Sequence, residues 1–186
     1  MMSDTQWPRF QVFVQEQLDA PHQDAGSVHA PDSEMALLNA RDVFARRPKC
    51  VSMWVVPTEA IYSKTAEEIL NQPPIGTEQS ASSVLEPAPS EKYHVFCKFK
   101  HAGTQIQVGS AEASGPAQAL EKAFEKYSSH HKPLVWWVFP ARMVTQSDPS
   151  EIGSLYEPAQ DKMFRMHTQF HTLTAMRDIE QSKGRK

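Results

Sequence analysis

The chain has 186 residues, of which 40% are hydrophobic and 22% charged, with a formal net charge of -3 and a pI near 6.2. This composition is typical of a globular protein and lacks the excess of basic residues that nucleic-acid binders carry. No apolar run approaches the roughly 18 residues of a membrane span, and no signal peptide is evident at the start. Cys50 and Cys97 are too few for a disulfide framework. We therefore expect a cytoplasmic protein with no nucleic-acid or membrane partner.

The first predicted elements form a ββαβ unit of about 50 residues. The run RFQVFVQEQ, residues 9–17, is rich in β-branched and aromatic residues and predicts a strand, from which the segment LDAPHQD turns back into a second strand. Asp32 or Ser33 then caps a helix over residues 34–47. The apolar run CVSMWVV, residues 50–56, predicts a strand buried on both faces, and the proline after it ends the pairing.

Residues 63–90 are rich in proline and serine, which is typical of a linker, with a short helix expected at TAEEIL. A second ββαβ pattern follows. Residues 91–100 predict a strand. The Ala-Gly pair after it predicts a tight hairpin turn, and residues 104–113 predict the return strand. Ser114 is placed to cap a helix with proline in its first turn, and PLVWWVF repeats the buried closing strand.

The two patterns align without a gap when the chain is shifted by 83 residues, from Phe10 to Tyr62 of the first copy. The alignment holds twelve identities, against roughly three expected by chance for average composition. The identical pairs are Val12/Val95, Phe13/Phe96, Gly26/Gly109, Ser27/Ser110, Ala30/Ala113, Ala36/Ala119, Leu37/Leu120, Ala40/Ala123, Lys49/Lys132, Trp54/Trp137, Val55/Val138 and Pro57/Pro140. We expect a first unit over residues 1–62, a linker over 63–90 and a second unit over 91–186.

The chain beyond the second unit is dense in aromatic residues and methionine, so we expect it to dock on a surface before a frayed basic end. His167 and His171 are spaced as a metal pair on a helix, but packing or surface histidines are the more common reading. A cluster of three acidic residues occurs at Glu151, Glu157 and Asp161, but no facing partner for acid-base catalysis is visible in the sequence. No nucleophile elbow, phosphate loop or cysteine metal motif occurs.

Three segments between Trp7 and Val56, WPRFQVFVQ, GSVHAPDSEMALLNARDVFARR and SMWVV, resemble the B-subunit family of bacterial phenylacetyl-CoA epoxidase. The tail fits the family as well, through Glu157-Pro158-Ala159 with Lys162, Phe164 and Arg165. The resemblance covers the first unit and the tail well and the second unit weakly. Family members are single units of about half this length. The chain is thus similar to a tandem fusion of two B-like units, in which the fused repeat replaces a homodimer.

The resemblance implies an α+β fold of two ββαβ units of the small ubiquitin-like-roll type. It also implies a non-catalytic subunit that bridges the catalytic A and structural C subunits of a di-iron monooxygenase that epoxidises the ring of phenylacetyl-CoA in phenylacetate catabolism. The di-iron site belongs to A, and flavin and iron-sulfur groups belong to a separate reductase, so no cofactor is expected on this chain. A contribution to electron transfer or regulation stays open.

Interface residues are expected on the charged helix face, where arginines can pair with partner carboxylates, and in the aromatic tail. These residues are Arg41, Arg46, Arg47, Tyr156, Phe164, Arg165 and Phe170. For the arginines, a solvated helix face is the competing interpretation. The alternative function is a stand-alone tandem module that binds a small aromatic or acidic ligand between its units, using the paired Trp54 and Trp137.

Overall fold

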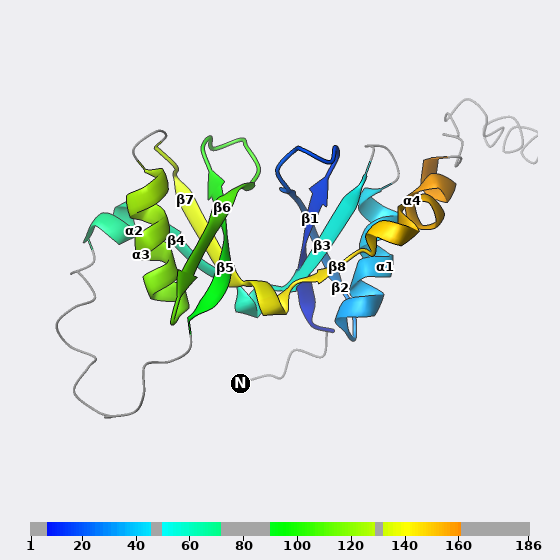
Figure 1. The fold of residues 1–186 in the computed structure, drawn as a ribbon, viewed down its shortest axis with the longest axis horizontal. Helices are drawn as coiled ribbons and strands as arrows, with labels where there is room; N and C mark the ends of the chain where they lie inside the picture. Colours follow the sequence, from blue (N-terminus) through cyan, green and yellow to red (C-terminus); the bar gives the residue numbers. More distant parts are fainter. Residues whose placement is uncertain (1–6, 46–49, 72–89, 129–131, 161–186) are drawn as a thin grey trace, which may run out of the picture.

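A computed structural model of the chain describes residues 7–45, 50–71, 90–128 and 132–160. In this part of the chain, eight antiparallel strands form a single sheet in the order β4-β7-β5-β6-β2-β1-β3-β8, with the helices at its two ends (Figure 1). Within the described residues, no helix is long and apolar enough to cross a membrane.

Both ββαβ units are present, and the 83-residue repeat is confirmed element by element. The first unit consists of β1 (Arg9–Gln15), β2 (Gln23–His29), α1 (Ser33–Phe44) and β3 (Ser52–Pro57). The second consists of β5 (Glu91–Lys98), β6 (Ile106–Ala113), α3 (Pro116–Tyr127) and β7 (Val135–Pro140). The paired helices and the paired closing strands are displaced by 83 residues at both of their ends.

Each unit is completed by the segment that follows the other unit. After a short 3-10 turn, η1 (Thr58–Ala60), β4 (Tyr62–Thr65) leaves the first unit and pairs along β7 of the second. The turn η2 (Ala141–Met143) likewise leads into β8 (Thr145–Gln146), which pairs with β3 of the first unit. The strand order is therefore symmetric about its centre, since each strand of one half has its repeat equivalent at the matching place in the other half. The chain crosses twice between the two halves.

Helices follow both exchanged strands. In the segment expected to be a linker, the predicted short helix is confirmed as α2 (Ala66–Asn71), directly after β4, while residues 72–89 lie outside the described residues. After β8, the turn η3 (Pro149–Glu151) leads into α4 (Ile152–Gln160). The Tyr156 side chain of α4 is only 1% exposed and belongs to the core of the first unit, with Ile152 and Leu155 packed beside it. The described start of the tail thus packs on the first unit, whereas residues 161–186 lie outside the described residues and their docking stays a prediction.

The helix caps match the predictions only in part. Asp32 caps α1, its carboxylate accepting a hydrogen bond of 2.8 Å from the Met35 backbone N-H, but the helix ends at Phe44, three residues earlier than predicted. The predicted Ser114 cap of α3 is wrong. The N-cap is Gly115, which has an extended backbone and no side chain to accept a capping hydrogen bond. The Ser114 hydroxyl and backbone N-H both donate to the Gln118 side-chain oxygen instead. Gln118, in the first turn of α3, therefore accepts the hydrogen bonds of the residue that precedes the N-cap.

The closing strands are buried on both faces, as their continuous apolar runs predict. In β3, Met53 and Val55 face the helix-side core with α1, whereas Trp54 and Val56 belong to a separate core cluster on the opposite face. The same alternation occurs in β7. Each half of the sheet therefore carries its helices on the outside and turns its other face toward the other half (Figure 1).

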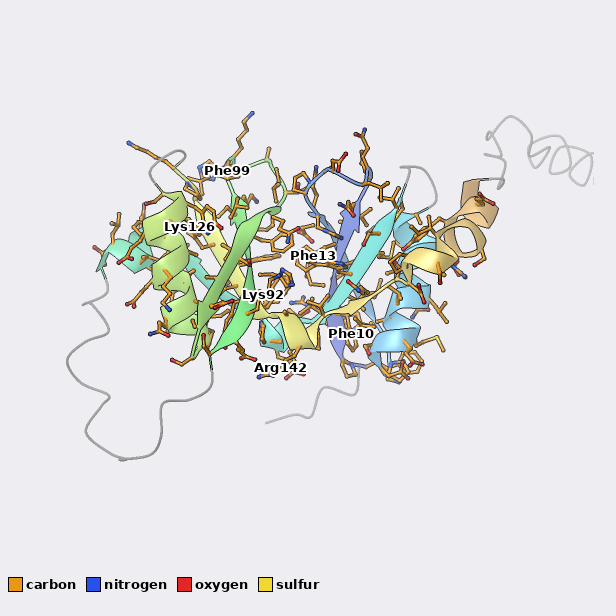
Figure 2. All side chains as sticks on the ribbon, in the orientation of Figure 1. Phe10, Phe13, Lys92, Phe99, Lys126 and Arg142 are labelled. Carbon is orange, nitrogen blue, oxygen red and sulfur yellow. The ribbon has the colours of Figure 1, made fainter. Side chains whose placement is uncertain are left out.

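The inner cluster joins the two units through residues related by the repeat. Its buried members are Phe13, Val56, Phe96 and Phe139. The rings of Phe13 and Phe96, which occupy equivalent positions, lie 4.4 Å apart between centroids, and Phe139 stacks 5.3 Å from each of them. Figure 2 shows Phe13 in the space between the two halves. A pseudo-twofold axis thus passes through the Phe13–Phe96 pair.

The shared glycines have a steric role. Gly26 and Gly109 lie at equivalent bulges with φ of +132° and +156°, a region that residues with a side chain rarely adopt. An aromatic ring from the helix of each unit occupies the space of the missing Cβ: a Cβ at Gly26 would meet Phe44 at 3.0 Å, and one at Gly109 would overlap Tyr127. The repeat therefore preserves a glycine–aromatic contact between sheet and helix.

Truncation of Tyr156 tests the exchange of the C-terminal segment. Tyr156→Ala is expected to lower the free energy of unfolding by about 3–5 kcal/mol, because it leaves a cavity in the first unit's core. Urea denaturation measures the loss. Leu70→Ala in α2 is the control, since Leu70 is 70% exposed and its truncation is expected to cost under about 0.5 kcal/mol. A Tyr156→Ala variant as stable as this control would contradict the docking of α4.

Candidate functional site

The groups considered for metal binding or acid-base chemistry do not form a site in the described structure. Among the described residues, no group of three or more His, Cys, Asp or Glu side chains is arranged to hold a metal ion. His167, His171 and Asp161 lie outside the described residues. Glu157 lies on α4 with an exposed side chain, and Glu151 ends the turn before that helix.

Two of the predicted interface residues lie in the described structure. Arg41, on α1, donates through its guanidinium to the carboxylate of its neighbour Asp42, at 3.0 Å. Tyr156 is buried within the chain rather than presented on its surface. The five others are outside the described residues and stay predictions: Arg46, Arg47, Phe164, Arg165 and Phe170.

The densest polar contacts between the units form what we call the histidine seam: His22, Ser52, Trp54, His94 and Gln107. The His22 Nδ1 lies 3.3 Å from Gln107 Oε1, and its Nε2 lies 3.1 Å from Ser52 Oγ. Trp54 lies between the two imidazoles, with its ring centroid 3.7 Å from that of His22 and 4.6 Å from that of His94. Since His94 and Gln107 belong to the second unit, the His22–Gln107 and Trp54–His94 contacts cross the junction.

The backbone at this junction is arranged symmetrically. Strand β2 is joined to β6 through the residue pair Gln23 and Ile106, which are themselves repeat equivalents. On either side of it, Gln107 donates its N-H to the His22 carbonyl at 2.9 Å, and Asp24 donates its N-H to the Gln105 carbonyl at 2.8 Å. The side chains break the symmetry, because the positions equivalent to His22 and His94 carry Gln105 and Gln11.

Both histidines are held in the neutral form. Burial lowers the pKa of His22 to about 4 against the counteracting hydrogen bond that its ring donates to Gln107 Oε1, and the proximity of His94 lowers it further. Burial, with a smaller effect from Lys92, also lowers the pKa of His94 to about 4. The neutral state suits the contacts, because the Gln107 amide nitrogen lies 3.5 Å from His94 Nδ1 and requires an acceptor there.

The first unit has a carboxylate where the second has Gln107. Asp24 accepts a hydrogen bond of 2.6 Å from the Gln11 amide and another of 3.1 Å from the Gly26 backbone N-H. Burial raises the pKa of Asp24 despite these bonds. Buried polar groups that are hydrogen-bonded across a junction fix its geometry, because an unpaired partner is costly to leave there. The seam therefore has the properties of a structural junction between the units.

Sequence analysis did not single out His22 or His94. Neither belongs to a motif, and the surrounding segments predict a loop and a strand. The available indication was the repeat itself, since both histidines stand where the other unit has glutamine and each is therefore specific to one copy. Trp54 and Trp137, which a ligand-binding module would use between its units, both pack against the inner cluster.

Comparison with known proteins identifies the repeat as two copies of one family domain. The sequence model of the PaaB family, described as phenylacetic acid degradation B, matches twice, over residues 6–93 and 89–177. The B component of 1,2-phenylacetyl-CoA epoxidase from Escherichia coli (strain K12) is 43% identical over 67 residues, which cover 36% of this chain and 70% of that protein. No solved structure matches the chain, so the ubiquitin-like-roll type stays a prediction.

The histidine seam predicts an acid-sensitive fold. The pKa of each histidine is about 4 in the folded chain and near 6.5 when unfolded, so the unfolded chain binds more protons between these values. We expect the free energy of unfolding to fall as the pH drops from about 6.5 to about 4. Asp24, whose pKa is raised, acts in the opposite direction, because at pH values above about 3.8 its carboxyl binds a proton more tightly in the folded chain than in the unfolded chain. Urea titrations across this range measure the slope.

The other copy supplies the control residues for this measurement. In the His22→Gln/His94→Gln variant each histidine is replaced by the residue that the opposite unit carries at the equivalent position. Its free energy of unfolding should change less between pH 6.5 and pH 4 than that of the native chain. An unchanged pH dependence in this variant would show that the seam is not responsible.

Proposed function

Because the chain belongs to the PaaB family, we propose that it is the B component of a multicomponent epoxidase that acts on phenylacetyl-CoA in phenylacetate degradation. The observation that carries this proposal is the double match, in which each ββαβ unit is covered by the same family domain. One chain then supplies two B-like units, and the internal pseudo-twofold takes the place of a contact between two copies.

The proposed role is to bridge partners rather than to perform the oxidation. The architecture supports this role, because a shared buried cluster joins two related units with their helices on opposite outer faces (Figure 1). The buried aromatic and histidine side chains are used in joining the units. In this proposal the catalytic A and structural C subunits of a cytoplasmic complex bind the bridging chain. The di-iron site belongs to A, and the flavin and iron-sulfur groups belong to the reductase.

The two outer faces differ, which gives a way to test where a partner binds. On α1 the side chains of Met35 and Leu38 are 43% and 42% exposed. The equivalent positions on α3 carry Gln118 and Glu121, so the apolar helix face belongs to the first unit alone. Exposed apolar side chains of this kind are common at protein interfaces. We propose that the outer face of α1 contacts a subunit of the complex.

Co-expression with A and C subunits of a phenylacetyl-CoA epoxidase tests the proposed function. The chain is expected to co-elute with both in size-exclusion chromatography. The Met35→Gln/Leu38→Glu variant, which gives α1 the residues of α3, is expected to bind about tenfold more weakly through lost apolar burial. The native chain's failure to associate, together with quenching of its tryptophan fluorescence by phenylacetate, would favour the stand-alone binding module instead.

A further inference from the structure

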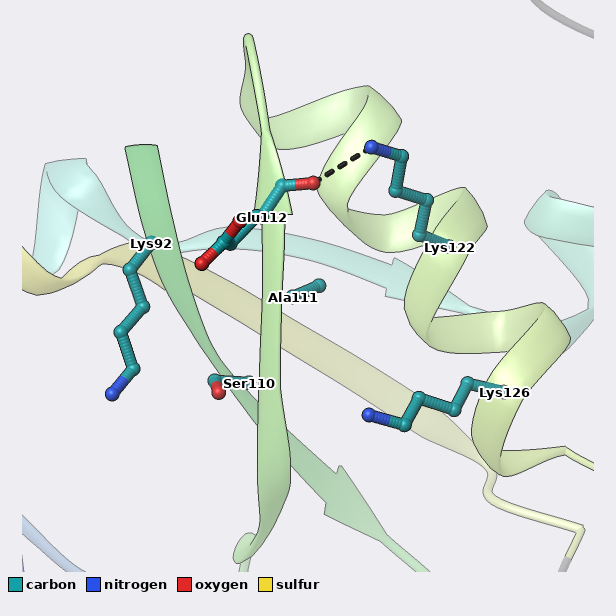
Figure 3. Close-up of a pocket in the computed structure, with 6 residues that line it drawn as sticks. All are labelled: Lys92, Ser110, Ala111, Glu112, Lys122 and Lys126. Carbon is teal, nitrogen blue, oxygen red and sulfur yellow. Dashed lines mark hydrogen bonds between the residues drawn. The ribbon is translucent and has the colours of Figure 1, made fainter. Parts of the chain in front are cut away.

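The second unit carries an open groove lined by cationic side chains. It runs along β6, with Lys92 of β5 on one side of that strand and α3 on the other, and has a volume of about 470 Å³ (Figure 3). We call it the lysine groove, and its lining residues are Lys92, Ser110, Ala111, Glu112, Lys122 and Lys126. Three ammonium groups against one carboxylate make the groove positive on a chain whose net charge is -3.

Two of the lysines are positioned by contacts within the unit. Lys122 Nζ donates a hydrogen bond of 2.7 Å to the backbone carbonyl of Glu112, as Figure 3 shows. Lys126 Nζ lies 5.1 Å from the centroid of the Tyr127 ring, the ring that covers Gly109. The Tyr127 hydroxyl donates to the Ser110 carbonyl at 3.5 Å. Side chains from α3 therefore occupy the outward carbonyls of β6, which disfavours addition of another strand there.

The first unit shows what the fold requires at these positions. The equivalents of Lys122 and Lys126 are Asn39 and Val43, and Asn39 donates to the His29 carbonyl at 3.2 Å in the same way that Lys122 donates to Glu112. An uncharged amide thus serves the contact between helix and strand. The positive charges of Lys122 and Lys126 are therefore specific to the second unit, since the first unit forms the same helix and strand with Asn39 and Val43 in their places.

We propose that the lysine groove binds an acidic, carboxylate-rich segment of a partner protein, at one site per chain. This inference extends the proposed function by giving the second unit its own partner contact. A protein segment fits better than a small anion, because the groove is open and its ammonium groups lie on both sides of β6 (Figure 3). Each ammonium is a point charge with several donors, which suits side-chain carboxylates spaced along an extended chain.

The test uses the full-length chain and a fluorescein-labelled peptide of eight glutamates, followed by fluorescence anisotropy at low salt. We expect saturable binding to one site that weakens with added NaCl, because exposed charges are screened. The Lys122→Asn/Lys126→Val variant carries the first unit's residues and keeps a donor for the Glu112 carbonyl. It is expected to bind about tenfold more weakly, as two exposed ion pairs are lost. Unchanged thermal unfolding would show that the variant is folded.

The reciprocal graft gives an independent readout. Asn39→Lys/Val43→Lys places the two lysines on the first unit, beside Arg9 in the position of Lys92, and is expected to raise the stoichiometry from one peptide to two. Equal peptide affinity in the native chain and the Lys122→Asn/Lys126→Val variant would overturn the proposal. Binding of inorganic phosphate without binding of the peptide would also overturn it. Because no A or C subunit is present, a negative result here leaves the proposed epoxidase association intact.

Discussion

The contact between Phe13 and Phe96 is the constraint on which the rest of the structure depends. The two rings are repeat equivalents, and their 4.4 Å separation places them on the pseudo-twofold axis with the inner faces of both half-sheets around them. A ββαβ unit of about 50 residues buries too little surface to be stable alone. Joining two such units through a shared aromatic cluster gives each closing strand a second buried face, as the burial of Val56 and Phe139 shows.

The exchanged segments follow from this arrangement. With the half-sheets facing each other, the chain leaving β3 pairs with β7 and the chain leaving β7 pairs with β3, so β4 completes the second unit and β8 completes the first. Neither half then has a complete sheet or core without the other, which makes the pair one structural unit. The two outer faces differ: α1 exposes apolar side chains, whereas the second unit carries the lysines of the groove.

The repeat, the ββαβ order and the buried closing strands were all predictable from sequence, because long apolar or alternating runs carry strong local information. The exchange was not predictable. β4 and β8 are short and polar, YSKT and TQ, and derive their conformation from pairing with a strand of the other unit. The histidine seam was missed for a related reason, since Gln107 and Trp54 approach His22 only after the units have docked. The cap at Gly115 was not predicted, because Ser114 donates its hydrogen bonds to the Gln118 side chain instead of capping the helix.

A double-mutant cycle on the axial pair tests this account most directly. Phe13→Leu, Phe96→Leu and the double variant are compared by urea denaturation, with the free energy of unfolding taken from each. Since the rings touch across the two units, we predict that the losses are not additive and that the coupling energy is about 0.5–1.5 kcal/mol. Losses that add within about 0.3 kcal/mol would contradict a fold organised around this contact.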